Sequence, residues 1–443
     1  MIFGTDEQTI LDLNIFPKLK GDSSVFSFYN STTTKGGRDE LEQMLRVPMC
    51  NLEDINYRIS TIKFISDNRI TCNLDNEYLD FIEFYINHNT PILHDNFYDS
   101  IIAKISYEIK PSNEYYIIQR GLEYLRNHLL ILSDFFKNID KINKPIFFDQ
   151  LLEEIERITD DPELEFFIKP NKERFTFRQI NRFDFLIRKN KKEIVKRILD
   201  FTYELDVYMS VSDVSKKRKL GFPVILKSSK PILKMTGFFH PLIENPIKND
   251  LKILDNKNFC FVSGANMSGK STFLKTAGLC VYLAHIGFPV PAKQMEISLF
   301  NGLYSTINIS DSIHKGYSHY YSEVKRVKDI ALMIKEKRNV MVIFDELFRG
   351  TNVKDAFDAT LMVSKGFSKI KESLFFVSTH IVELGEELEK IENIDFKCFK
   401  SSIDGDSPYY SYKLVNGISN ERLGLEILKK ENIMDIIKQI IAK

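Results

Sequence analysis

The chain is poor in cysteine and has no long uncharged apolar run. Its 443 residues include five cysteines, none in a Cys-x-x-Cys pair or at metal-ligand spacing: Cys50, Cys72, Cys260, Cys280 and Cys398. Cysteines scattered through apolar runs are typical of reduced core residues in an intracellular protein. No apolar run approaches the ~20 residues of a membrane span, and residues 1–7 lack the basic-then-apolar order of a signal peptide. These absences predict a soluble, cytoplasmic protein with no membrane partner.

An excess of charge is also lacking, because 61 Lys and Arg balance 61 Asp and Glu. No global field therefore attracts a polyanion, and any basic surface must be local. Glycine almost disappears between Gly37 and residue 230, where long helical patterns dominate. A chain of this length predicts two or three domains.

Apolar strand-like runs begin only in the second half of the chain. From Lys234 onward they alternate with helical stretches, the order of a parallel α/β sheet. The runs 258–263, 340–344 and 374–378 are apolar throughout, as expected for strands buried on both faces. The sequence thus predicts an α + α/β multidomain protein with its helical part first.

A long helix is predicted between residues 180 and 208, with a partner helix over 113–136. Apolar residues recur there at near-heptad spacing with a gap near Lys191, the pattern of a seam between packed helices: Ile180, Phe183, Ile187, Ile194, Ile198, Phe201, Leu205 and Tyr208. The two helices would form an antiparallel arm with its tip around 141–177.

Charge is unevenly distributed along this arm. Residues 169–219 hold fifteen Lys and Arg against seven Asp and Glu, whereas residues 141–168 hold three against eight. A basic helix could lie along a nucleic-acid backbone. The alternative is a solvated helix face whose lysines pair with the acidic tip, and the sequence does not separate the two.

A complete phosphate-binding loop, G-x-x-x-x-G-K-S, follows the strand 258–263 and precedes a helix-like run, 272–285. Its glycines let backbone N–H groups surround phosphate oxygens, and the helix N-terminus adds partial positive charge. Lys270 would reach the β- and γ-phosphates and Ser271 would ligate Mg²⁺. A chance glycine-rich turn is the alternative. The predicted nucleotide-binding residues are Gly264, Ala265, Asn266, Met267, Ser268, Gly269, Lys270, Ser271 and Thr272.

Two later strands end in residues suited to phosphate chemistry. The strand 340–344 runs into Asp345 and Glu346. We expect Asp345 to hold Mg²⁺ and Glu346 to polarise the attacking water. The strand 374–378 leads to His380, which could hydrogen-bond the γ-phosphate or the water; a surface histidine is the alternative. Lys270, Glu346 and His380 are the predicted catalytic residues, and ATP and Mg²⁺ the predicted ligands.

The stretch 316–323 lies between the phosphate loop and the carboxylate strand. A serine at a helix start, Ser318, can present a hydroxyl to phosphate. Because it is far along the chain from its own loop, a contribution across a dimer is conceivable, and the physics alone does not decide.

Together these segments resemble the MutS family of ATPases, relatives of the ABC-type ATPases. The loop 264–272, the stretch 345–352 and Thr379-His380 are similar to that family's nucleotide site, and Gly316-x-Ser318 to its trans-acting signature. In the first half, 30–38 and 204–207 resemble the MutS core and lever. Residues 412–417 and 424–427 are similar to the helical hairpin by which MutS ATPase domains pair.

The resemblance implies a helical core-and-lever domain over 1–233 and an ABC-like P-loop ATPase domain over 234–443, with a C-terminal dimerisation hairpin. It also marks departures. The chain starts at the core domain, so the mismatch-reading and connector domains are expected to be absent. Phe348 replaces a usual glycine, and Ile247 stands where an aromatic tends to stack on adenine, so Ile247 or a nearby aromatic would contact the base.

The function this resemblance implies is Mg²⁺-dependent ATP hydrolysis that switches a homodimeric, clamp-like assembly on DNA, in mismatch repair or related DNA repair and recombination. Sequence support for DNA itself is limited to the basic stretch 169–219. The alternative is an ATP-gated assembly factor that binds a protein or a ribosome and no DNA. Salt-sensitive DNA binding would separate the two.

Overall fold

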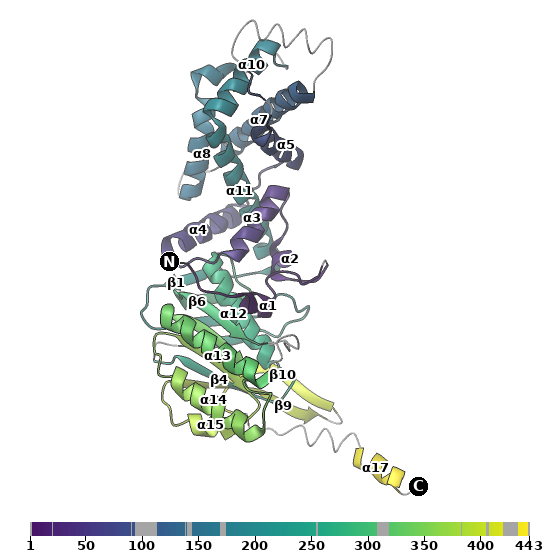
Figure 1. Ribbon diagram of the computed structural model, residues 1–443, viewed down its shortest axis with the longest axis vertical. Coiled ribbons are helices and arrows are strands. Elements are labelled where there is room, and N and C mark those ends of the chain that lie inside the picture. Colours follow the sequence, from purple (N-terminus) through teal and green to yellow (C-terminus); the bar gives the residue numbers. More distant parts are fainter. Residues whose placement is uncertain are drawn as a thin grey trace. The chain divides into compact units, whose positions relative to one another are not determined.

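We analysed a computed structural model of the chain, drawn in Figure 1. It describes residues 2–19, 21–89, 91–93, 113–137, 139, 144–168, 174–253, 256–307, 319–381, 383–404, 407–419 and 433–441. Within these residues, no helix combines the length and the apolar character needed to cross a membrane.

The chain forms two compact units whose segments alternate along the sequence. The first, a mixed helix-and-sheet unit, contains Met1–Phe28, Val47–Asn56 and Arg218–Lys443. The second, a helical unit, contains Tyr29–Arg46 and Tyr57–Lys217. A helical first half and a mixed second half were both predicted. The helical unit ends at Lys217, not at residue 233, and the first 28 residues group with the second half of the chain.

A six-stranded sheet in the order β10-β9-β4-β8-β7-β6 forms the centre of the mixed unit. All neighbouring strands are parallel except β10, which pairs antiparallel with β9. β4, β6, β7 and β8 are buried along their whole length, as predicted for strands covered on both faces. The strands are β4 (Phe259–Ser263), β6 (Gly302–Thr306), β7 (Val340–Asp345), β8 (Leu374–Thr379), β9 (Ile394–Asp404) and β10 (Ser407–Asn416).

Helices pack against this sheet (Figure 1). The apolar cluster on one face joins α13 and α14 to the strands through Ile330, Phe367 and Phe344. α12 is buried almost throughout, and a Cβ at its Gly278 would lie 2.7 Å from Ile343 of β7, so glycine permits close packing there. The helices of the mixed unit around the sheet are α12 (Lys270–Ile286), α13 (His319–Glu336), α14 (Val353–Phe367) and α15 (Glu383–Leu388). The last described helix is α17 (Ile433–Ile441), whose apolar residues are exposed.

A smaller sheet in the order β1-β5-β2-β3 completes the mixed unit. β1 and β5 are parallel, and β2 is antiparallel to both of its neighbours. Its strands are β1 (Pro223–Leu226), β2 (Leu233–Phe238), β3 (Asn249–Ile253) and β5 (Gln294–Ser298). The resemblance of residues 412–417 to a helical hairpin is wrong, because 412–416 form the end of β10. Residues 424–427 lie outside the described residues.

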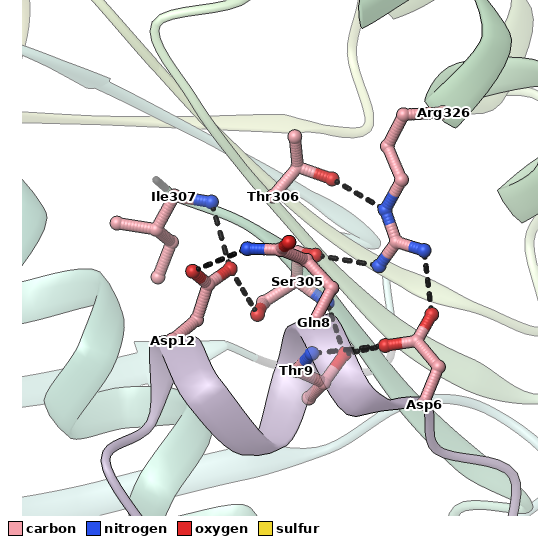
Figure 2. Close-up of polar contacts among 8 residues, drawn as sticks. All are labelled: Asp6, Gln8, Thr9, Asp12, Ser305, Thr306, Ile307 and Arg326. Carbon is pink, nitrogen blue, oxygen red and sulfur yellow. Dashed lines mark hydrogen bonds and ion pairs between the residues drawn. The ribbon is translucent and has the colours of Figure 1, made fainter. Parts of the chain in front are cut away.

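The N-terminal helix α1 (Glu7–Asp12) is fixed to the end of β6 by polar contacts (Figure 2). The buried carboxylate of Asp12 accepts hydrogen bonds from the Ser305 hydroxyl (2.8 Å) and the Ile307 N–H (2.9 Å). Arg326 of α13 donates to Asp6 (2.5 Å) and to the Ser305 carbonyl (2.7 Å). These charge-assisted bonds tie α1 to the mixed unit, which is why the start of the chain groups with the second half.

The backbone ahead of α1 also pairs with β6. Gly4 forms a parallel bridge with Gly302, in which the Gly4 N–H donates to Asn301 and the Leu303 N–H donates to Gly4, each at 2.8 Å. A Cβ at Gly302 would lie 2.7 Å from the Gly4 oxygen. The two backbones can therefore approach this closely only because glycine is present.

The helical unit agrees with the predicted arm in part. α7 covers the predicted partner helix, and His128 of α7 lies 3.1 Å from the Thr202 hydroxyl of α11. The long helix is interrupted by a π-helical turn over Leu186–Asn190, next to the gap noted at Lys191. The helices are α2 (Val25–Tyr29, at the junction of the units), α3 (Lys35–Arg46), α4 (Leu52–Asn68, shared by the two units), α5 (Asn76–Asn87), α7 (Asn113–Lys137), α8 (Ile146–Thr159), a 3₁₀ turn (Pro162–Leu164), α9 (Glu165–Ile168), α10 (Phe177–Phe185) and α11 (Lys192–Arg218).

Part of the basic stretch pairs with the acidic tip. Lys191 lies 2.6 Å from Asp161, and Arg197 lies 3.0 Å from Glu154 of α8. These two cations therefore pair with the acidic tip, as the alternative to nucleic-acid binding predicted.

Asp206 of α11 holds the residues that lead into α3. Its buried carboxylate accepts from the Thr33 N–H (3.0 Å), the Thr34 N–H (2.8 Å) and the Thr34 hydroxyl (2.7 Å). A Cβ at Gly37 would lie 2.3 Å from the Asp206 Oδ2, so only glycine leaves room for the carboxylate at this position. A single side chain therefore joins two segments that are far apart in the sequence.

We expect Asp206→Ala to lower the free energy of unfolding of the helical unit by about 3 kcal/mol, because buried donors lose a charged acceptor. Asp206→Asn should lie between this variant and the wild type. Asp213→Ala, at an exposed position of the same helix, is the control. Urea unfolding of the full chain followed by far-UV circular dichroism measures the effect. Equal midpoints for the two alanine variants would contradict it.

Candidate functional site

The phosphate-loop motif connects β4 to α12 in the mixed unit. Gly264 (φ 148°) and Gly269 (φ 103°) adopt backbone conformations that favour glycine, and Gly269 is the N-cap of α12. A Cβ at Gly264 would lie 2.9 Å from the Ser268 hydroxyl and 3.1 Å from the Phe399 carbonyl. The spacing of the glycines thus follows from the turn that the loop makes.

Lys270 is buried beneath this loop. Its Nζ donates to the carbonyl oxygens of Gly264 (2.9 Å) and Ala265 (3.1 Å) and lies 3.3 Å from the Glu346 carboxylate. The lysine from one predicted motif and the glutamate from another therefore meet, although Glu346 follows Lys270 by 76 positions along the chain.

Glu346 lies at the centre of a group of basic side chains. It follows β7 with φ 50°, is 7% exposed, and pairs with Arg349 and with His380 Nδ1 (3.3 Å) as well as with Lys270. Burial raises the pKa of Glu346, but the His380 hydrogen bond and the charges of Lys270 and Arg349 outweigh it and lower that pKa to about 2. Glu346 is therefore ionised at neutral pH.

Three parallel strands end side by side at this point. Ser263 of β4 is in register with Thr379 of β8, and Ser378 of β8 with Asp345 of β7. The buried Asp345 carboxylate accepts a hydrogen bond from the Ser378 hydroxyl. Such strand ends are where open α/β sheets bind their ligands.

A pocket of about 530 Å³ opens beside the loop. Six of the nine predicted loop residues line it, together with Glu346 and the predicted base contact Ile247. Gly264, Ala265 and Ser268 do not line it, although the first two provide carbonyls to Lys270. Its remaining lining residues are Phe238, Phe239, His240, Ile243, Asn245, Pro246, Asn249, Phe273, Thr276, Arg349, Phe399 and Tyr412.

The aromatic wall of this pocket was predicted only as an unnamed aromatic residue near Ile247. Tyr412 adopts φ 51° where the β9–β10 register shifts, and its ring lies against the phosphate loop, 3.3 Å from where a Gly269 Cβ would stand. Asn249 of β3 holds this bulge by donating to the Tyr412 carbonyl (3.0 Å) and accepting from the Leu414 N–H (2.9 Å). A bulge can redirect a side chain in this way.

Two more pocket residues were not singled out from the sequence. Arg349 follows Glu346 by three residues, a spacing that could have marked it as a partner of that carboxylate. Burial, assisted by the charge of Lys275, lowers the pKa of His240 to about 4, so that side chain is neutral at pH 7.

The second residue after the carboxylates departs from the glycine that the resemblance predicts. Phe348 has φ 65° and is 3% exposed, packing 5.8 Å from the Tyr320 ring. Burial of the phenyl ring thus offsets a backbone conformation that disfavours residues with a Cβ. Ser318, the predicted trans contact, lies outside the described residues.

Two family models match the chain. MutS domain III matches residues 8–324, more than half of the chain, and MutS domain V matches residues 260–442. The chain belongs to the MutS family.

Curated relatives include DNA mismatch repair proteins MutS of three bacteria. That of Petrotoga mobilis is 30% identical over 239 residues, which is 53% of this chain and 29% of the relative. That of Anaplasma phagocytophilum is 29% identical over 51% of this chain and 27% of the relative. That of Thermotoga petrophila is 29% identical over 56% and 31%. This MutS-family chain thus spans under a third of these relatives' length.

Proposed function

We propose that the chain is a MutS-like ATPase whose mixed unit acts as an ABC-like P-loop ATPase domain. The observation that supports this most directly is the meeting of Lys270, Glu346 and His380 at adjacent strand ends beside the pocket. A buried cation for phosphate and a buried carboxylate for water are the groups that in-line hydrolysis of ATP requires.

Lys270 would bind the β- and γ-phosphates. Phosphate oxygens would replace the Gly264 and Ala265 carbonyls as acceptors for its Nζ, while the N–H groups at the start of α12 donate to the same phosphates. The loop residues that line the pocket, Asn266 to Thr272 except Ser268, would surround the triphosphate.

Glu346 would orient and polarise the attacking water. Lys270 lowers the pKa of Glu346, so its transfer to phosphate would leave a more basic carboxylate facing the water. His380, 3.3 Å from Glu346 and half exposed, could contact the γ-phosphate or the water from the other side. Binding of ATP would thereby make Glu346 a stronger base.

Ser271 and Asp345 fit a magnesium site of the phosphate-bound type. The described residues contain no cluster of three or more His, Cys, Asp or Glu side chains that would hold a metal by itself. A hydroxyl at the helix start and a buried carboxylate at a strand end are instead the protein ligands expected when phosphates complete the shell. The bound Mg²⁺ would neutralise charge that develops on the phosphates.

The aromatic wall would hold the base. Tyr412 is 44% exposed and Ile247 is 46% exposed at the pocket, and Phe239 lies on the same wall. A ring and an aliphatic side chain can enclose a purine from its faces. This assigns the base contact to Tyr412 together with Ile247.

ATP hydrolysis would switch a homodimeric, clamp-like assembly on DNA, in mismatch repair or related repair. Ser318 would act on the partner's nucleotide. Exposed apolar residues on α17 offer a pairing surface larger than a short helix needs for itself: Ile433, Met434, Ile436, Ile437, Ile440 and Ile441. Exposed cations on the helical unit, such as Arg182 and Lys189, would contact phosphates.

Salt-dependent DNA binding tests this function. With ATP and Mg²⁺, duplex affinity should fall about 10³-fold between roughly 50 and 200 mM salt if six or more phosphates are contacted. The double variant Arg182→Ala, Lys189→Ala should lower the slope of log affinity against log salt concentration by about two. Lys354→Ala, on α14, is the control. Anisotropy with plain, mismatched and branched duplexes measures this. ATP hydrolysis without DNA binding would instead indicate a protein or ribosome partner.

A further inference from the structure

The outward face of α5 combines aromatic rings with carboxylates. Leu79, Ile82, Tyr85 and Ile86 form its buried side. Beside this buried side, α5 and α7 together form what we call the α5–α7 aromatic face, made of Tyr78, Phe81, Phe84, Tyr116, Arg120 and Tyr124. Helical spacing of i+3 and i+4 places these side chains in one stripe on each helix.

The rings form a continuous series. Tyr78 stacks on Tyr124 with centroids 4.6 Å apart, Phe81 meets Tyr124 edge-on at 5.4 Å, and Phe84 meets Phe81 at 6.0 Å. Phe84, at one end of the series, is 48% exposed. Tyr116, which is connected to Tyr124 through the guanidinium of Arg120, is 50% exposed, so both rings are accessible. Tyrosine and arginine are the residues that contribute most where proteins bind one another.

Carboxylates border these rings without cationic partners. Glu77, Asp80 and Glu83 are exposed, and α5 contains no Lys or Arg. Neutral groups hold them: Tyr124 donates to Glu77 (2.7 Å), Asn76 to Asp80 (3.1 Å) and Tyr203 to Glu83 (3.1 Å). In the part of the chain that the structure describes, none of the three forms an ion pair. Their charge is therefore available to a cation from outside.

Arg120 shows how a guanidinium fits this surface. Its Cζ lies 5.9 Å from the Tyr116 ring centre and 5.6 Å from the Tyr124 ring centre, and it pairs with Glu123 at 3.1 Å. Arginine is suited to such a site because its planar group stacks on rings while it bonds carboxylates. A phosphate backbone would be repelled by Glu77, Asp80 and Glu83.

We propose that the α5–α7 aromatic face is a docking surface for an arginine-bearing segment of a protein partner. The guanidinium groups of the partner would stack on the rings, and the three carboxylates of α5 would accept hydrogen bonds from the guanidinium N–H groups. This inference concerns the helical unit and does not depend on the nucleotide pocket.

An oligo-arginine peptide and an oligo-lysine peptide of equal length, both fluorescently labelled, test it on the full chain. The wild type should bind the arginine peptide more tightly. Phe84→Ala with Tyr116→Ala should weaken arginine binding about tenfold, as expected for two lost cation–π contacts, and change lysine binding about twofold at most. Asp80→Asn with Glu83→Gln should weaken both. Leu130→Ala, exposed elsewhere on α7, is the control.

Three results would overturn the proposal. The first is arginine-peptide binding that the aromatic pair of substitutions leaves unchanged, with the unfolding midpoint confirming an intact fold. The second is weaker duplex DNA binding in that same variant, which would make the face a nucleic-acid surface. The third is loss of a wild-type dimer in the variant with both aromatic substitutions, measured by sedimentation, which would assign the face to a second copy of the chain.

Discussion

Glu346→Gln is expected to bind ATP with Mg²⁺ and to turn it over about 10²-fold more slowly than the wild type, or slower still. Glutamine keeps the shape of the side chain and can still hydrogen-bond water, but it cannot accept a proton. The carboxylate that it replaces lies 3.3 Å from both Lys270 and His380, in the position that faces the proposed phosphate site. Single-turnover phosphate release, with nucleotide affinity measured separately, distinguishes the chemical step from binding.

Glu372→Gln is the matched control, because the same chemical change is made at an exposed position of the mixed unit. It should leave turnover unchanged. If Glu346→Gln hydrolysed ATP at the wild-type rate, the water-activating role would have to pass to another carboxylate, and Asp345 would be the first to examine.

Lys270→Ala should weaken ATP binding about 10²-fold, since a buried charged donor to two phosphate groups is lost. The substitution also removes a cation from Glu346, whose pKa should rise from about 2 toward its ordinary value. Isothermal titration with ATP and Mg²⁺ measures the affinity. Lys354→Ala, at an exposed site of the same unit, controls for the loss of one positive charge.

The two variants should fail in different ways. Glu346→Gln retains nucleotide and loses chemistry, whereas Lys270→Ala loses nucleotide first. Unchanged affinity in Lys270→Ala would remove the assignment of the loop to phosphate binding, whatever happens to turnover.

The parts of the site that were predicted from the sequence depend on local geometry. The loop between β4 and α12 needs glycine at 264 and 269 because of backbone φ angles set within a few residues. The strand ending at Asp345 could be located because a doubly covered strand is apolar along its whole length. Both kinds of signal depend only on residues that are adjacent in the sequence.

The pocket wall could not be predicted because its determinants are far apart. Asn249 holds the Tyr412 bulge from another sheet, across 163 residues of chain. No local pattern indicates that a residue in the middle of β10 adopts a left-handed conformation. The π-helical turn at Leu186–Asn190 is similar, since only a gap in the apolar seam hinted at it.

The pairing of Gly4 with Gly302 has a consequence for how the molecule can be divided. β6 is the last strand of the six-stranded sheet, so its outer backbone groups would otherwise be open to any passing strand. The first residues of the chain cover part of that edge, and α1 covers its end. A fragment beginning at Lys234 would keep every residue that lines the pocket and still present an uncovered strand, so the first residues of the chain belong in any fragment that contains this sheet.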